Sequence, residues 1–107
     1  MAFKALCLTH APDGDPEKHR CAIDTGRYKL ITVVVRNQAQ ALQVARDTHE
    51  KEPIHAVMLC PGFTHRDTAE LYEALKGEVS VSVCRGDGPS NRIVQPVIRR
   101  EYYDRTD

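Results

Sequence analysis

Four residues with chemically active side chains lie beside turn-forming segments of this 107-residue chain: His10, Cys60, His65 and Arg85. A cysteine thiolate is a strong nucleophile, and a neighbouring imidazole can take the proton of its thiol. We therefore take Cys60, His10 and His65 as candidate catalytic residues, with Cys60 as the nucleophile. The alternative is that Cys60 simply ends a buried apolar segment, because free cysteines are among the most buried residue types.

Charged and polar residues in the same segments suggest a binding site for a small anion. Arginine suits carboxylates and phosphates, and the first N–H groups of a helix attract anions. Arg36, Thr64, Arg85 and Asp87 are therefore the candidate ligand-binding residues. The alternative is that Arg36 and Arg85 are solvated partners of Asp13 and Asp87.

A metal site is not expected, although His10, His65, Asp13 and Cys60 are chemically suitable ligands. No two of them have the close spacing that marks a metal site in a sequence. The remaining histidines are expected to be surface or packing residues: His19, His49 and His55. No cofactor can be identified from the sequence.

Four apolar segments are typical of buried β-strands, at residues 3–9, 28–35, 54–60 and 79–84. The second contains the β-branched run from Ile31 to Val35, which favours a strand with both faces covered.

Helix signals separate these strands. Asp15-Pro16-Glu17 predicts a short helix that ends near residue 25, with Asp as N-cap and Pro in the first turn. Asn37 and Gln40 resemble a capping box that opens a second helix, which should stop before Pro53. Thr64 and Asp67 predict the start of a third helix, and Gly77 its end.

The alternation of strands and helices predicts an α/β fold: a small, mostly parallel four-stranded sheet with helices packed on it, like a cut-down flavodoxin. We expect one domain over residues 1–107, strand order 2-1-3-4 and right-handed crossovers. In such sheets ligands bind outside the carboxyl ends of the strands. The candidate residues all follow those ends, so they should share one edge.

The segment 92–107 lies beyond the last predicted strand and is interpreted as a fifth edge strand or a C-terminal arm. Ile93, Val94, Val97 and Ile98 have little core left to receive them, and Pro96 bars a central strand. We expect this segment to contribute to a homodimer.

Composition excludes several classes of protein. Fifteen basic and fifteen acidic residues give a net charge of zero, which argues against a nucleic-acid partner. No apolar run approaches the roughly 20 residues of a membrane span, and the N-terminus lacks the pattern of a signal peptide. The four cysteines occur singly, as expected for free thiols in a reducing cytoplasm.

Two stretches carry a family resemblance: Ala11 to Arg20, and Leu59 to Phe63 with the strand that ends Val83-Cys84-Arg85. Together with the helix between them, they resemble a family of short bacterial proteins of unknown function, over roughly residues 3–88. The resemblance implies a compact α/β fold and brings no activity or substrate.

Three functions remain open. The first is a small-molecule-binding protein or small enzyme that acts on an anionic or carbonyl-bearing metabolite at the carboxyl edge of the sheet. The second is a non-catalytic oligomeric or adaptor domain, and the third is a thiol-redox or metal-handling protein. The concentration of His, Cys, Arg and Asp at the strand ends favours the first.

Overall fold

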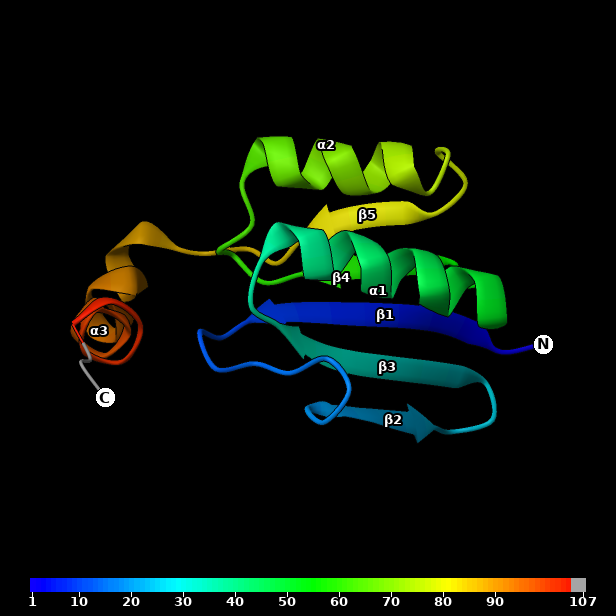
Figure 1. The fold of residues 1–107 in the computed structure, drawn as a ribbon, viewed down its shortest axis with the longest axis horizontal. Helices are drawn as coiled ribbons and strands as arrows, with labels where there is room; N and C mark the ends of the chain where they lie inside the picture. The colour runs from blue at the N-terminus through cyan, green and yellow to red at the C-terminus, as the bar shows by residue number, and fades with distance from the viewer. Residues whose placement is uncertain (105–107) are drawn as a thin grey trace.

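A five-stranded mixed sheet forms the centre of the protein in a computed structural model, which describes residues 1–104 (Figure 1). The sheet order is β2-β3-β1-β4-β5, and only β2 runs antiparallel to its neighbour. The elements are β1 (Phe3–His10), β2 (Arg20–Asp24), β3 (Tyr28–Val35), α1 (Gln38–Lys51), β4 (Ala56–Leu59), α2 (His65–Ala74), β5 (Ser80–Val83), α3 (Gly88–Ile98) and a π-helical turn, η1 (Arg99–Tyr103).

The four predicted strands correspond to β1, β3, β4 and β5, and their predicted order is confirmed. Thr64 and Asp67 form the complete capping box of α2: each side chain accepts a hydrogen bond from the other residue's N–H. At α1 the Asn37 side chain accepts from Gln40 N–H, but the Gln40 side chain accepts from the N–H of Arg36. The second predicted box is therefore only half formed.

The predicted helix at residues 15–25 is wrong. The Asp15 carbonyl accepts from the N–H groups of Lys18 and His19, so a single turn forms where the cap was expected. The chain then becomes β2, which pairs antiparallel with β3 after a turn at Gly26, where φ is +99°. Pairing along the free edge of β3 outweighs the local helix signal, because it satisfies the backbone groups of both strands.

Of the two alternatives expected for residues 92–107, an edge strand or a C-terminal arm, the edge strand is wrong. Residues 88–98 form α3 instead, with Pro89 in its first turn and Pro96 in its interior, and η1 follows. An interior proline removes one helical hydrogen bond, and the widened π-turn begins three residues after Pro96. The last three positions of the expected segment, 105–107, lie outside the described residues. No helix within residues 1–104 combines the length and apolar character that a membrane span requires.

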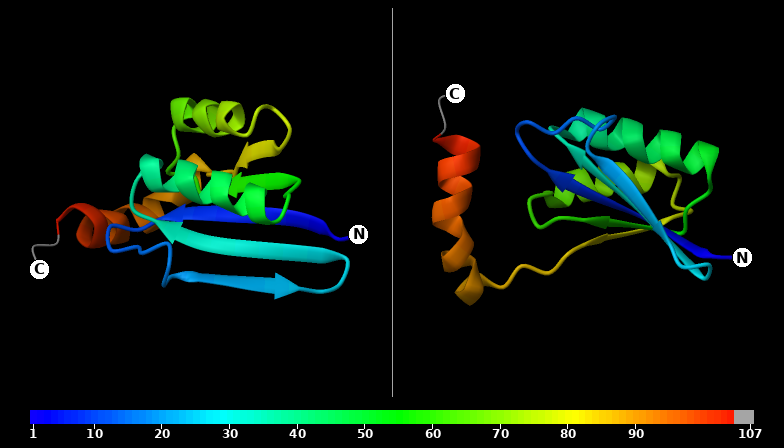
Figure 2. Two further views of the ribbon diagram at one scale, coloured as in Figure 1. Left: turned by 45° about the vertical axis from the view of Figure 1, so that its right-hand side comes forward. Right: turned by 90° about the horizontal axis from the view of Figure 1, so that it is seen from below.

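The molecule has two layers, with α1 and α2 on the same face of the sheet (Figure 2). Both crossovers, from β3 to β4 and from β4 to β5, move in the same direction across the sheet, so right-handed connections place their helices on the same side. The opposite face carries no helix from the described residues (Figure 2). The core lies between helices and sheet and includes Leu6, Leu8, Val33, Val57, Leu59 and Leu71.

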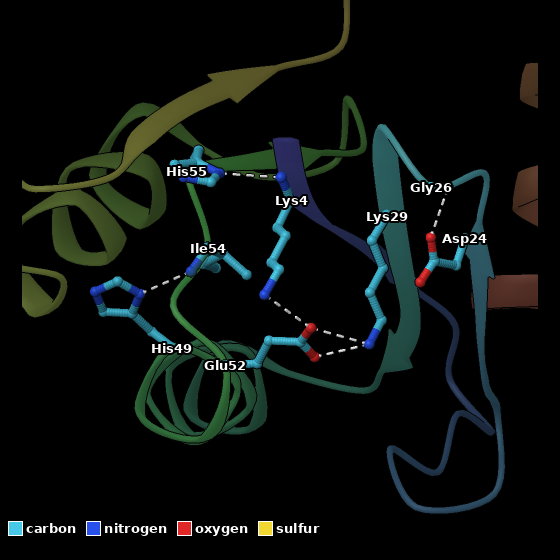
Figure 3. Close-up of polar contacts among 8 residues, drawn as sticks. All are labelled: Lys4, Asp24, Gly26, Lys29, His49, Glu52, Ile54 and His55. Carbon is cyan, nitrogen blue, oxygen red and sulfur yellow. Dashed lines mark hydrogen bonds and ion pairs between the residues drawn. The ribbon is translucent and has the colours of Figure 1, made fainter. Parts of the chain in front are cut away.

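A cluster of polar side chains lies at the amino-terminal edge of the sheet (Figure 3). The Glu52 carboxylate lies between Lys29 Nζ, at 2.8 Å, and Lys4 Nζ, at 3.1 Å. The hydrogen bonds from Lys29 and Lys4 hold the pKa of Glu52 below its ordinary value. His49 Nδ1 accepts from Ile54 N–H, and His55 Nδ1 accepts from Lys4 N–H. These histidines therefore stabilise the backbone where strands begin.

Candidate functional site

The carboxyl ends of β1, β4 and β5 bring His10, Cys60 and Arg85 to one edge of the sheet, as predicted. His10 is the last residue of β1. The N–H of Cys60 donates to the Leu8 carbonyl at 3.1 Å, and the N–H of Cys84 donates to the Leu59 carbonyl at 2.7 Å. These bonds extend the ladder past the ends of β4 and β5, so the loops leave the sheet at adjacent points.

Cys60 and His10 are the two candidate catalytic residues that the structure brings together at this edge. The Sγ of Cys60 lies 4.0 Å from Nδ1 of His10, the long end of hydrogen bonding to sulfur. Such contacts are often loose in a site without substrate and tighten when one binds. Among the described residues, His10 rather than His65 is the imidazole within reach of this thiol.

Two aromatic residues fix the position of His10. The ring of Phe63 stacks on the imidazole, with centroids 4.0 Å apart and planes at 21°. The hydroxyl of Tyr102 donates to the His10 carbonyl at 2.8 Å. Sequence reasoning missed both residues. Phe63 could have been suspected from its place in the loop after Cys60, whereas Tyr102 has no local signal.

Partial burial lowers the pKa of His10 below its ordinary value, and the nearby carboxylate of Asp67 offsets part of that effect. Burial disfavours the charged imidazolium because the charge loses its hydration. His10 is therefore neutral at pH 7 and able to accept a proton.

Gly62 leaves free space beside Cys60 and His10. A Cβ atom at this position would lie 3.5 Å from Nδ1 of His10 and 3.7 Å from Sγ of Cys60. Both are ordinary van der Waals distances, so a methyl group would fit without displacing backbone. It would occupy the space directly beside Nδ1 of His10 and Sγ of Cys60.

The start of α2 is already occupied by protein groups. Thr64 is the N-cap, and its hydroxyl accepts from the N–H of Asp67. The Asp67 carboxylate lies at the positive end of the helix dipole, where an anionic ligand would otherwise be favoured. His65 is the first residue of α2 and is exposed.

The other predicted ligand-binding residues also have protein partners. Arg85 Nε lies 2.7 Å from Oδ1 of Asp87, and the Arg85 side chain is 86% exposed. Arg36 Nη1 donates to the Gly14 carbonyl at 3.0 Å, on the far side of β1 from Arg85. The arginines therefore do not converge on one point.

All four cysteines are free thiols. Cys7, on β1, has its pKa raised by burial and by the thiols of Cys84 and Cys60. Within residues 1–104, no three His, Cys, Asp or Glu side chains are grouped so that they could hold a metal ion.

A pocket of about 560 Å³ opens elsewhere, on the helix side of the sheet beside α1. Ile31 of β3 lies among its lining residues, with Val44 of α1 and Arg20 of β2. His10, Cys60, His65 and Arg85 do not line it. Sequence reasoning missed this pocket because it placed a helix over residues 15–25, where the structure has a loop and an edge strand.

Comparison with known proteins gives a family but no activity. Neither the curated proteins nor the solved structures gave a match. One family profile matches residues 3–98, nearly the whole chain and ten residues further than the resemblance in its sequence suggested. The chain belongs to this family, a family of unknown function designated DUF6506.

Proposed function

We propose that this protein binds a small carbonyl-bearing metabolite at the carboxyl edge of its sheet and acts on it through Cys60 and His10. The observation that supports this most directly is the 4.0 Å approach of Cys60 Sγ to Nδ1 of His10. A thiol beside a neutral imidazole is the arrangement that nucleophilic catalysis needs.

The first chemical step would be addition of the thiol to the carbonyl group. The Cys60 proton passes to Nδ1 of His10, and the thiolate sulfur forms a bond to the carbonyl carbon. The π electrons of the C=O bond move to oxygen, which takes the proton back from His10. The product is a hemithioacetal, and the step needs no oxidant or reductant.

Two features favour a carbonyl group over an anion as the recognised chemistry. The Asp67 carboxylate occupies the N-terminal end of α2 and would repel a phosphate or carboxylate there. Arg85 is already paired with Asp87, so its charge is partly neutralised. Arg85 and Asp87 would contact the more distant part of the ligand.

We also propose that the protein works in the cytoplasm. Four free cysteines, two of them exposed, persist as thiols in a reducing compartment.

Alkylation by iodoacetamide, followed peptide by peptide with mass spectrometry, tests the reactive pair. In the folded protein Cys60 should react faster than its partial burial alone would allow, and a small aldehyde such as glycolaldehyde should protect it. Cys84, which is exposed and follows β5, is the internal control that the aldehyde should protect less.

Single substitutions test whether His10 and the free space beside Gly62 control the reactivity of Cys60. His10→Gln should slow alkylation of Cys60, whereas His65→Gln, at the start of α2, should leave the rate unchanged. Gly62→Ala should slow it as well, because its methyl group fills the space beside Sγ. Equal rates in the parent, His10→Gln and Gly62→Ala proteins, or equal protection of Cys60 and Cys84 by the aldehyde, would refute the proposal.

A further inference from the structure

The helix-free face of the sheet is made of uncharged side chains. Side chains alternate along a strand, so the neighbours of the core residues Leu6, Leu8 and Val33 point away from the helices. The strand register aligns them in two rows that cross all five strands: Cys21, Thr32, Cys7, Met58 and Ser82, and then Ile23, Leu30, Ala5, Ala56 and Ser80. We call these ten residues, together with Phe3 and Tyr28, the uncharged face.

This composition does not fit a surface that faces water. Charged residues make up 28% of the chain, yet the uncharged face has none in twelve positions. An antiparallel or mixed sheet with one solvated face normally alternates apolar and polar residues. Here Ile23 remains 57% exposed and Phe3 50% exposed, although both could be buried by a covering layer. Exposed apolar side chains grouped on one face of a sheet, as Ile23 and Phe3 are here, mark an interaction surface.

The same chain carries an apolar helix that also lacks a covering partner. In α3, Ile93 is 68% exposed, Val94 45% and Val97 46%. No residue of α3 is buried, and its main packing contact is with η1, the turn that continues it. Figure 2 shows α3 standing beyond the carboxyl ends of the strands, away from the uncharged face of its own chain.

The position of α3 favours a second copy of the chain as the occupant of the uncharged face. The hydroxyl of Tyr102 ties the end of this helical segment to the His10 carbonyl, which holds α3 at the carboxyl edge. An 11-residue helix is about 16 Å long, close to the width of four adjacent strands at about 4.8 Å each. Zero net charge removes long-range repulsion between two copies.

We propose that α3 of a second copy docks on the uncharged face, and that the reciprocal contact makes a two-fold symmetric dimer with exchanged C-terminal helices. Each copy then gives one helix and receives one, as a closed two-fold interface requires. Each sheet gains a helical layer on its second face. This inference does not depend on the chemistry proposed for Cys60.

Sedimentation of the full-length protein and of matched variants tests the interface. The parent should be a dimer at micromolar concentration. Ile23→Lys places a charge on the exposed edge of the uncharged face and should weaken the dimer roughly tenfold or more, because a buried lysine would lose its hydration. Ala22→Lys, next along β2 on the opposite face, should leave it unchanged.

The helix side of the contact has its own variants. Ile93→Asp/Val97→Asp should weaken the dimer by a similar factor, whereas Gln95→Asp on the same helix should not. Circular dichroism of each variant establishes that the fold is retained. A monomeric parent refutes the proposal, and so does a dimer that either Ile23→Lys or the double variant leaves intact.

Mixing the two defective chains distinguishes exchanged helices from direct face-to-face packing. A chain with Ile23→Lys still has an intact α3, and a chain with the double substitution still has an intact uncharged face. In an exchanged dimer the mixture recovers one undamaged contact, so mixed dimers should exceed both homodimers. If the mixture shows no such recovery, the exchanged arrangement is wrong. It is also wrong if the protein is a monomer in which α3 of the same chain protects Cys21 from alkylation.

Discussion

The hydroxyl of Tyr102 donates a 2.8 Å hydrogen bond to the backbone carbonyl of His10, which precedes it by 92 positions in the sequence. The bond joins the end of the C-terminal helical segment to the strand end that presents His10 to Cys60. Because the His10 carbonyl is part of the backbone at the site, movement of η1 is coupled to the residue we propose as a base. The C-terminal segment therefore contacts the candidate site itself.

Replacing Tyr102 with Phe should loosen α3 and η1 while leaving the sheet intact. An exposed neutral hydrogen bond contributes about 1 kcal/mol net, so amide exchange in residues 88–103 should accelerate by roughly fivefold at most. Hydrogen–deuterium exchange with mass spectrometry measures this. Tyr103→Phe is the matched control, because the Tyr103 side chain is 78% exposed, and it should leave exchange unchanged. Equal exchange in both variants would show that the Tyr102 bond does not hold the segment.

The order of the four parallel strands was predictable because each one is a continuous apolar run, and right-handed crossovers allow few arrangements. The start of α2 was equally predictable, since Thr64 and Asp67 act on each other three residues apart. The capping contact is local in the sequence, whereas the strand order follows from the apolar character of whole segments and the handedness of the connections between them.

β2 was missed because its stability comes from a neighbour and not from its own residues. Arg20–Asp24 is exposed along its whole length and has no apolar alternation strong enough to indicate a strand. Its hydrogen bonds with β3 decide the conformation. The Asp15-Pro16-Glu17 cap signal was real but supports only one turn.

The candidate site was predictable in location and less so in detail. Strand order placed His10 and Cys60 at one edge, but it could not say which of His10 and His65 faces the thiol. That choice depends on Phe63, which stacks on the His10 ring. Side-chain packing of this kind is set by the complete fold and leaves no pattern in the sequence.

Glu52→Gln should destabilise the protein at neutral pH and have progressively less effect in acid. Glu52 accepts hydrogen bonds from Lys29 and is paired with Lys4, and these contacts lower its pKa in the folded state (Figure 3). A carboxyl group with a lowered folded pKa stabilises the fold above its unfolded pKa, which is near 4.5. That stabilisation is lost as pH falls through the folded value.

Urea unfolding of the parent and of Glu52→Gln at a series of pH values measures this difference. The difference in the free energy of unfolding between the two proteins should be largest at pH 6–7 and should disappear as the pH falls well below 4.5. Glu50→Gln, on the exposed side of the same helix, is the control and should show no such convergence. A gap that stays constant with pH would mean that the contribution of Glu52 is steric rather than ionic.

Gly14→Ala should destabilise the protein by about 1–3 kcal/mol, the usual cost of forcing a methyl group into a packed site. Gly14 is buried, and an added Cβ would lie 2.8 Å from Cγ1 of Val34 and 3.2 Å from the Ala11 carbonyl oxygen. The Gly14 carbonyl also receives the Arg36 side chain, so a shift of this loop would disturb the chain that leads into α1. Strain of this kind cannot relax outward, because backbone lies on one side and β3 on the other.

Gly88→Ala is the matched control, because nothing lies within 4 Å of its added Cβ. Gly88 begins α3, and alanine there should be neutral or stabilise the fold by about 0.4–1 kcal/mol, since it restricts the unfolded chain more than glycine does. Chemical denaturation of both variants, with unchanged m-values, gives the comparison. A Gly14→Ala protein as stable as the parent would show that the loop between β1 and β2 is not packed against Val34 as described.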